Sequence, residues 1–129
     1  SNNWVAEFGL KTESRLGHRV VLYLTNHYSR KITIAELTKE FNLNRNSLYQ
    51  EFQETTGLSL IAYLIRLRIK MASVLLAETS MPVAEIMERV GYTDLTHFGR
   101  AFKKITGFTP IDYRKQNRLK TTSSGENRS

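Results

Sequence analysis

The stretch LTHFGRAFKKITGFTPIDYR, residues 95–114, decides the fold because an earlier part of the chain repeats it. Residues 45–64 read RNSLYQEFQETTGLSLIAYL, and the two segments align at a spacing of 50 positions. The positions that are identical in both copies are Phe52/Phe102, Thr56/Thr106, Gly57/Gly107, Ile61/Ile111 and Tyr63/Tyr113. Further back, Ala35-Glu36-Leu37 aligns with Ala84-Glu85-Ile86 at a spacing of 49. The sequence therefore predicts one structural unit built twice.

Each copy reads as a short helix, a tight turn and a second helix. Asn44 and Asp94 stand where an N-cap is expected, and Gly57 and Gly107 stand where glycine ends a helix in the left-handed conformation. Two helices joined by a turn of three to four residues form the helix-turn-helix pattern. In that pattern the second helix enters the DNA major groove and contacts base edges.

The rest of the chain also reads as helix, so the expected fold is all-α, with seven helices and no strand. Ser59 is expected to cap a long helix over residues 60–78, and Thr109 to cap a last helix that begins at Pro110. Tyr63 and Tyr113 are expected to pack beneath the second helix of each copy. The predicted organisation is an N-terminal segment or linker tail (1–14), a first helix-turn-helix subdomain (15–58), a linking helix (59–79), a second helix-turn-helix subdomain (80–117) and a disordered C-terminal tail (118–129).

The composition favours a polyanionic partner. The 129 residues carry a net charge of +7, of which residues 1–56 contribute +1 and residues 57–129 contribute +6. The chain has no cysteine, no membrane-length apolar run and no signal-peptide pattern. Because it begins without methionine, it is expected to be a fragment of a longer protein.

The outward faces of the two second helices carry polar side chains at matching positions. With Leu48 and Phe52 packed inward, residues 45–55 present Asn46, Tyr49, Gln50 and Gln53. Residues 95–106 present Thr96, Gly99, Arg100 and Lys103 at the same four positions. Asn and Gln can pair with adenine and Arg with guanine, while lysines suit phosphates. Segment 45–55 has a net charge of −1, so Glu51 and Glu54 are expected on its flanks, and segment 95–106 has +3.

Gly99 raises a separate question, because glycine inside a helix costs about 1 kcal/mol relative to alanine. Close approach of DNA to the backbone and tight packing between helices are both open explanations.

Over about residues 16–116 the chain resembles the DNA-binding domain of AraC/XylS-family bacterial transcription regulators. The motifs that carry this resemblance are RLRIKMASVLL (66–76) and VGYTDLTHFGRAFKKITGFTPIDYR (90–114). The resemblance implies two helix-turn-helix units, joined by one helix, in successive major grooves. It implies an activator, more rarely a repressor, in the cytoplasm at the nucleoid. The expected partner is double-stranded DNA, and RNA polymerase and a separate N-terminal sensing or dimerisation domain are open as further partners. No cofactor and no membrane contact are expected.

Position by position, the resemblance and the outward faces together give a set of candidate contacts. The predicted base-reading residues are Asn46, Tyr49, Gln50, Gln53, Leu95, Thr96 and Arg100. The predicted phosphate contacts are Asn44, Arg45, Arg68, His97, Lys103 and Lys104. Leu95 and Tyr49 depart from the polar residues common at their positions, so the family does not supply the DNA sequence.

The two alternatives to DNA binding are a protein–protein interaction module and an enzyme. A polar stripe on one helix is usually a solvated face, but the same stripe recurs in an internal repeat of a basic chain. A helical protein–protein module with a basic face would need an exposed apolar patch, and nearly all large apolar residues have a core assignment. An enzyme ranks third because the sequence shows no catalytic constellation. His18, His27 and His97 share no metal-ligand spacing.

Overall fold

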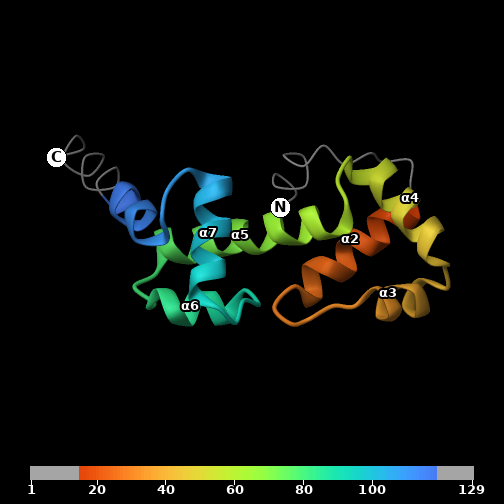
Figure 1. Cartoon of the computed structure of the whole chain (residues 1–129), viewed down its shortest axis with the longest axis horizontal. Coiled ribbons are helices and arrows are strands. Elements are labelled where there is room, and N and C mark those ends of the chain that lie inside the picture. Colours follow the sequence, from red (N-terminus) through yellow and green to blue (C-terminus); the bar gives the residue numbers. More distant parts are fainter. Residues whose placement is uncertain (1–14, 119–129) are drawn as a thin grey trace. The chain divides into compact units, whose positions relative to one another are not determined.

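The structure is a computed structural model that describes residues 15–118, and within this range it contains seven helices and no strand (Figure 1). The helices are α2 (Arg15–His27), α3 (Ile34–Phe41), α4 (Arg45–Thr56), α5 (Leu60–Glu78), α6 (Val83–Arg89), α7 (Leu95–Thr106) and a last helix over 110–118. The all-α prediction is confirmed. The predictions made for residues 1–14 and 119–129 lie outside the described residues.

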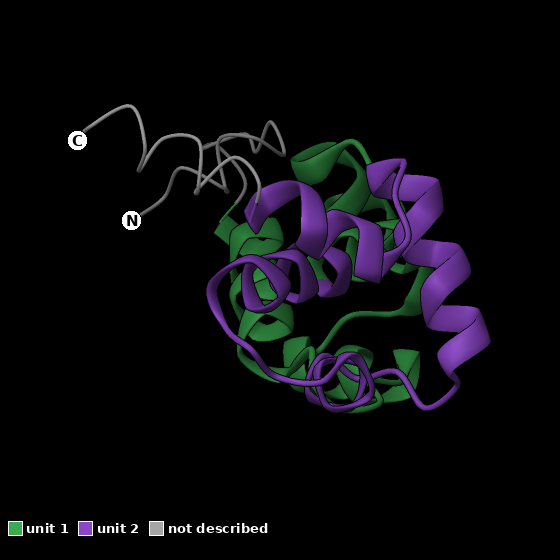
Figure 2. Ribbon diagram, turned by 90° about the vertical axis from the view of Figure 1, so that its left-hand side faces the viewer, with its two compact units in different colours: residues 1–67 green, residues 68–129 purple. Residues whose placement is uncertain are grey.

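The chain divides into two compact units, residues 1–67 and residues 68–129 (Figure 2). The division falls inside α5, so this helix contributes its first half to unit 1 and its second half to unit 2. The assignment of residues 59–79 as a separate linking element stays a prediction.

Unit 1 is built by α2, α3 and α4, which contact one another in all three pairs. Each helix buries an apolar face, as the spacing of its apolar residues predicts. The core side chains of this unit are Val20, Val21, Leu24, Leu37, Leu48, Phe52, Leu60, Tyr63 and Leu67. In unit 2, α6 contacts α7, and the core side chains are Ile69, Ala72, Leu76, Ile86, Met87, Val90, Tyr92, Phe98 and Phe102.

The repeated tyrosines pack against the repeated phenylalanines in the same way in both units. Tyr63 meets Phe52 edge-on with ring centroids 5.3 Å apart, and Tyr113 meets Phe102 edge-on at 5.4 Å. Burial raises the pKa of Tyr63 to about 12. The predicted structural role of both tyrosines beneath α4 and α7 is confirmed.

The repeated threonines close the corner after each second helix with identical hydrogen bonds. The hydroxyl of Thr56 lies 2.9 Å from the carbonyl oxygen of Phe52 and 3.1 Å from that of Leu58, and it accepts the N–H of Leu58 at 3.0 Å. Thr106 makes the same contacts with Phe102 and Phe108, at 2.9, 3.1 and 3.1 Å. The following glycines, with φ of 75° and 86°, adopt the left-handed conformation that the repeat predicts.

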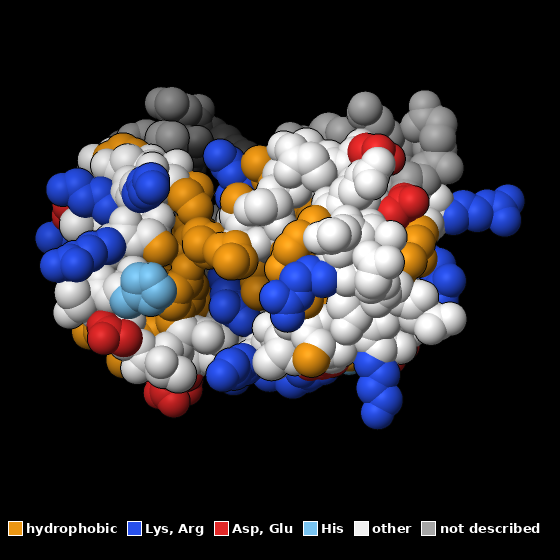
Figure 3. All heavy atoms as spheres, turned by 45° about the vertical axis from the view of Figure 1, so that its right-hand side comes forward, with side chains coloured by type: hydrophobic (Ala, Val, Ile, Leu, Met, Phe, Trp, Pro, Cys, Tyr) orange, Lys and Arg blue, Asp and Glu red, His pale blue; other side chains and the backbone are white. Residues whose placement is uncertain are grey.

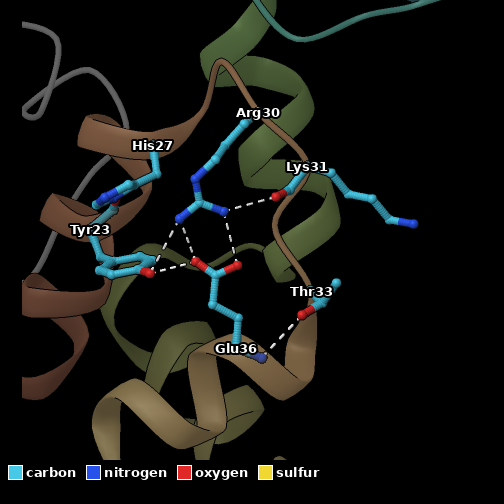
Figure 4. Close-up of polar contacts among 6 residues, drawn as sticks. All are labelled: Tyr23, His27, Arg30, Lys31, Thr33 and Glu36. Carbon is cyan, nitrogen blue, oxygen red and sulfur yellow. Dashed lines mark hydrogen bonds and ion pairs between the residues drawn. The ribbon is translucent and has the colours of Figure 1, made fainter.

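A polar cluster fixes the loop between α2 and α3 in unit 1 (Figure 4). The guanidinium of Arg30 donates to both carboxylate oxygens of Glu36, at 2.9 and 2.6 Å, and Tyr23 donates its hydroxyl proton to the same carboxylate. These hydrogen bonds, first that of Arg30 and then that of Tyr23, lower the pKa of Glu36 to about 2. The N-cap Thr33 accepts the N–H of Glu36 at 3.1 Å, so the cluster also anchors the start of α3.

In unit 2 two arginines attach the last helix to the end of α5, Arg114 through three hydrogen bonds and Arg118 through one, from Nη2 to the carbonyl of Thr79 at 3.3 Å. Arg114 donates from Nε to the carbonyl of Leu76 at 3.1 Å, and from Nη2 to the carbonyls of Thr79 and Met81 at 3.2 and 2.7 Å. These carbonyls belong to the end of a helix and the turn after it, where backbone acceptors lack intrahelical donors. Arg114 therefore caps the C-terminal end of α5 from the last helix, although α6 and α7 lie between them in the sequence.

Among the described residues seven large hydrophobic side chains are exposed, and the five besides the predicted base-reading residues Tyr49 and Leu95 correct the expectation that nearly all large apolar residues lie in the core. They are Leu22, Tyr49, Ile61, Leu95, Ile105, Phe108 and Ile111. Ile61 is 72% exposed, and its equivalent in the repeat, Ile111, is 57% exposed. Both occupy the second position of a helix. Figure 3 shows hydrophobic side chains at the surface among lysines and arginines. In the described residues no helix combines the length and apolarity needed to cross a membrane.

Candidate nucleic-acid interface

Helices α4 and α7 begin and end at equivalent residues, 50 positions apart, and their ends are fixed by the predicted caps. Asn44 accepts the N–H of Ser47 on its side-chain oxygen at 2.8 Å, and Asp94 accepts that of His97 at 3.0 Å. The turn before α4 contains Asn42 with φ of 52°, and the turn before α7 contains Gly91 with φ of 99°. These local signals set the direction in which each second helix leaves its turn.

The outward face of α4 carries all four predicted base-reading residues of unit 1, and all four are exposed. On the opposite side Leu48 and Phe52 are fully buried. Gln50 donates from Nε2 to a carboxylate oxygen of Glu54 at 3.2 Å, so Glu54 lies beside the predicted reading face rather than away from it. Gln53 donates from Nε2 to the carbonyl of Gly57 at 3.1 Å.

The outward face of α7 is basic. Leu95, Thr96, Arg100, Lys103 and Lys104 are all exposed, while Phe98 and Phe102 on the opposite side are fully buried. The basic residues of the last turn also suit the negative end of the helix dipole.

A hollow of about 480 Å³ lies beside each second helix. The hollow of unit 2 is lined by Leu95, Thr96, Gly99, Arg100, Lys103, Lys104, Thr109 and Pro110. The hollow of unit 1 is lined by Ile32, Ile34, Tyr49, Gln53, Ser59, Leu60 and Ile61. Four lining positions are equivalent in the repeat: Tyr49/Gly99, Gln53/Lys103, Ser59/Thr109 and Leu60/Pro110. The residues that line this place in the fold therefore include no charged residue in unit 1 and three basic residues, Arg100, Lys103 and Lys104, in unit 2.

The sequence did not predict these hollows. The faces of α4 and α7 can be predicted from helical periodicity. The other lining residues, among them Ile32, Ile34, Ser59 and Thr109, lie beside these faces only because of the tertiary structure. One sequence feature could have indicated part of this lining: a capping hydroxyl recurs at Ser59 and Thr109, so the next helix starts at the same place in both copies.

Among residues 15–118 no contact requires glycine at position 99. A Cβ added at Gly99 would meet nothing within 4 Å, so tight packing within the described chain does not explain the residue. Its backbone conformation is helical, so a left-handed angle does not explain it either. Close approach of a partner is the remaining explanation of the two raised by the sequence.

Of the predicted phosphate contacts, Asn44, Arg45, His97, Lys103 and Lys104 are exposed. Arg68 differs from the others because it is half-buried, with its guanidinium 6.0 Å from the centre of the Tyr92 ring. Burial lowers the pKa of Arg68. The structure thus brings five of the six to the surface, favours a packing role for Arg68, and leaves all six contacts as predictions. In the described part of the chain, no group of three or more His, Asp or Glu residues could hold a metal ion.

Comparison with known proteins identifies the family. The family described as "Helix-turn-helix domain" matches residues 37–116. The chain is 35% identical over 115 residues to the uncharacterized HTH-type transcriptional regulator YdiP of Escherichia coli, covering 89% of this chain and 38% of that protein. It is 29% identical over 111 residues to the HTH-type transcriptional activator RhaS of Klebsiella pneumoniae, covering 86% of this chain and 40% of RhaS.

A solved structure gives the same assignment at the level of the fold. The C-terminal domain of AraT, a response regulator from Geobacillus stearothermophilus, superposes with a TM-score of 0.77 at 32% identity, covering 82% of this chain and 88% of that domain. The chain spans about two fifths of the length of YdiP and RhaS. With its duplicated helix-turn-helix corner, matching family and structural relatives, the chain belongs to the AraC/XylS-type helix-turn-helix domains.

Proposed function

We propose that this chain binds double-stranded DNA sequence-specifically and regulates transcription, with activation as the expected direction. A domain of this family is a part of transcription regulators and not an enzyme. The observation that carries the proposal is the pair of exposed outward faces on α4 and α7, which lie opposite the fully buried Leu48 and Phe52 on α4 and Phe98 and Phe102 on α7. Activation is proposed because RhaS is named an activator.

In this proposal each unit inserts its second helix into a major groove, and the two grooves are successive. Asn46, Gln50 and Arg100 carry the side chains best suited to pair with base edges, Asn and Gln with adenine and Arg with guanine. Lys103 and Lys104 contact phosphates and supply the salt-dependent part of the affinity. RNA polymerase and a separate sensing or dimerisation domain are proposed partners of the full-length protein, and its proposed location is the bacterial cytoplasm.

The first test is selection of this chain against randomised duplex DNA at about 150 mM salt, where non-specific binding is already weak. We expect an enriched site of about 20 base pairs with two short boxes one helical turn apart. A single enriched box would restrict base reading to one unit. No enrichment at all would contradict the proposal.

Three single variants then separate base reading from phosphate contact. Arg100→Ala and Lys103→Ala each remove one positive charge from exposed positions of the same helix, and Lys115→Ala removes one from the last helix as a charge-matched control. Arg100→Ala should cost about 1–3 kcal/mol on the selected site and relax specificity at one base position. Lys103→Ala should weaken selected and scrambled duplexes alike and reduce the salt slope by about 1. Equal losses from Arg100→Ala on both duplexes would exclude its base-reading role.

The exposed hydrophobic residues keep a second function under consideration, a protein–protein interaction module. A protein–protein module needs an exposed apolar patch, and the sequence predicted none. The apolar hollow of unit 1 provides such a patch, lined by Ile32, Ile34 and the exposed Ile61. If selection on DNA fails while Ile61→Ser abolishes binding of a protein partner, this second function replaces the first.

A further inference from the structure

The glycine at position 99 is unusual because it stands in the middle of a regular helix whose neighbours do not need it. It lies on α7 between the exposed Thr96 and Arg100, and apart from its chain neighbours and the backbone of its own helix no described atom lies within 4 Å of the place where a Cβ would stand. Alanine at this position would fit the chain as it is and would be the better helix former. The constraint that favours glycine therefore lies outside the described chain.

The surroundings of Gly99 indicate which kind of partner imposes it. Gly99 lines the hollow of unit 2 together with Arg100, Lys103, Lys104 and the hydroxyl-bearing Thr96. Three cationic side chains with no carboxylate among the lining residues favour a polyanion. The equivalent residue of unit 1 is Tyr49, 43% exposed and in an apolar hollow, so this opening in the helix surface is particular to unit 2.

We infer that Gly99 admits duplex DNA to the backbone of α7 more closely than any side chain would allow. Gly99 is thus a positioning residue: it makes no hydrogen bond of its own with a side chain, and it sets the depth at which Thr96 and Arg100 meet the duplex. This inference rests on the proposed function, because it assumes that α7 faces DNA. It adds to the predicted contacts a residue that contributes by having no side chain.

The test uses Gly99→Ala and Gly99→Leu on the duplex that the unmodified chain selects. Both substitutions raise helix propensity, so the melting temperature should rise by about 4 °C for alanine. The dissociation constant should nevertheless increase about tenfold for alanine, as overpacking a close contact would cause, and further for leucine. Greater stability combined with weaker binding is the expected signature, and a folding defect cannot produce it.

Ala101→Gly is the matched control, since it makes the reverse exchange two positions away on the same helix and outside the hollow. It should lower the melting temperature and leave the affinity of the folded chain unchanged. Equal loss on selected and unrelated duplexes for Gly99→Ala would assign the close approach to the sugar-phosphate backbone. Loss confined to the selected duplex would assign it to a base edge.

Three results would overturn the inference. Unchanged affinity in both Gly99 variants would show that nothing approaches the helix there. A lowered melting temperature for Gly99→Ala would show that the fold itself needs the glycine. A change of oligomeric state in sedimentation, without loss of DNA binding, would assign the contact to a second copy of the chain. Failure of the proposed function is distinguishable from all three, because then the unmodified chain itself selects no duplex.

Discussion

Replacing the repeated threonines by valine should destabilise the first corner more than the second. Valine has almost the same shape as threonine and a similar helix propensity, so Thr56→Val and Thr106→Val remove little besides the hydroxyl. In both corners that hydroxyl has one proton to donate, to either of two carbonyls, and it accepts one backbone N–H. Each substitution therefore deletes two hydrogen bonds.

The difference between the two corners comes from their exposure. Thr56 is 5% exposed, and the N–H of Leu58 that it accepts is partly buried, whereas the N–H of Phe108 that Thr106 accepts is exposed. At about 1 kcal/mol per hydrogen bond, and with water unable to replace the lost partner fully, Thr56→Val should cost about 2–3 kcal/mol. At the exposed corner water replaces part of the loss, so Thr106→Val should cost about 1 kcal/mol.

The assay is urea unfolding followed by circular dichroism at 222 nm, with the free energy of unfolding taken from the midpoint and slope. If the two units unfold in separate transitions, each variant is compared in the transition that it shifts. Equal costs, or a larger cost for Thr106→Val, would refute the reasoning from exposure. A cost below about 0.5 kcal/mol for both variants would show that the hydroxyls do not hold the corners.

Four further perturbations test individual contacts. The pKa of Glu36 is lowered from 4.5 to about 2, so its carboxylate should stabilise the fold fully above pH 4.5 and lose that contribution as the pH falls through 2. Urea unfolding across pH should therefore show that the stability difference between the unmodified chain and Glu36→Gln shrinks over that window. Arg114→Lys should cost about 1–2 kcal/mol in urea unfolding, because one ammonium cannot replace the fork that donates to three carbonyls. Tyr92→Phe should leave the melting temperature unchanged or raise it, because the buried hydroxyl of Tyr92 has no hydrogen-bond partner among the described residues. Ile61→Ser should change the free energy of unfolding by less than about 0.5 kcal/mol, as expected for a side chain that is 72% exposed.

The parts of the fold that the sequence predicted are those that depend on nearby residues. The caps at Asn44, Asp94, Ser59 and Thr109 act on N–H groups three positions ahead, so they can be found from local spacing alone. The repeat allowed predictions beyond such local spacing, because a residue that is identical at the same position of both copies stands out from its neighbours. That is how the packing role of the two tyrosines could be predicted without any knowledge of the partners they contact.

The parts that the sequence did not predict depend on contacts between distant residues. Arg114 reaches carbonyls more than thirty positions away, and nothing near it in the chain indicates that α5 ends beside it. The hydrophobic character of Ile61 also does not indicate that this side chain is 72% exposed in the fold. The candidate interface was predicted as two helix faces, but the hollows beside them needed the placement of neighbouring loops and helix starts.

The repeat separates residues that hold the corner from residues that face outward. Four of the five identical pairs have a structural role in both units: the packed rings, the bonded threonines and the left-handed glycines. By contrast, all four outward positions differ, with Asn, Tyr, Gln and Gln on α4 and Thr, Gly, Arg and Lys on α7. Helices that present different donors, acceptors and depths to DNA cannot prefer the same half-site. The proposed site for a single chain is therefore asymmetric, and a palindromic sequence from the selection would require two chains, each using the same one of its two units.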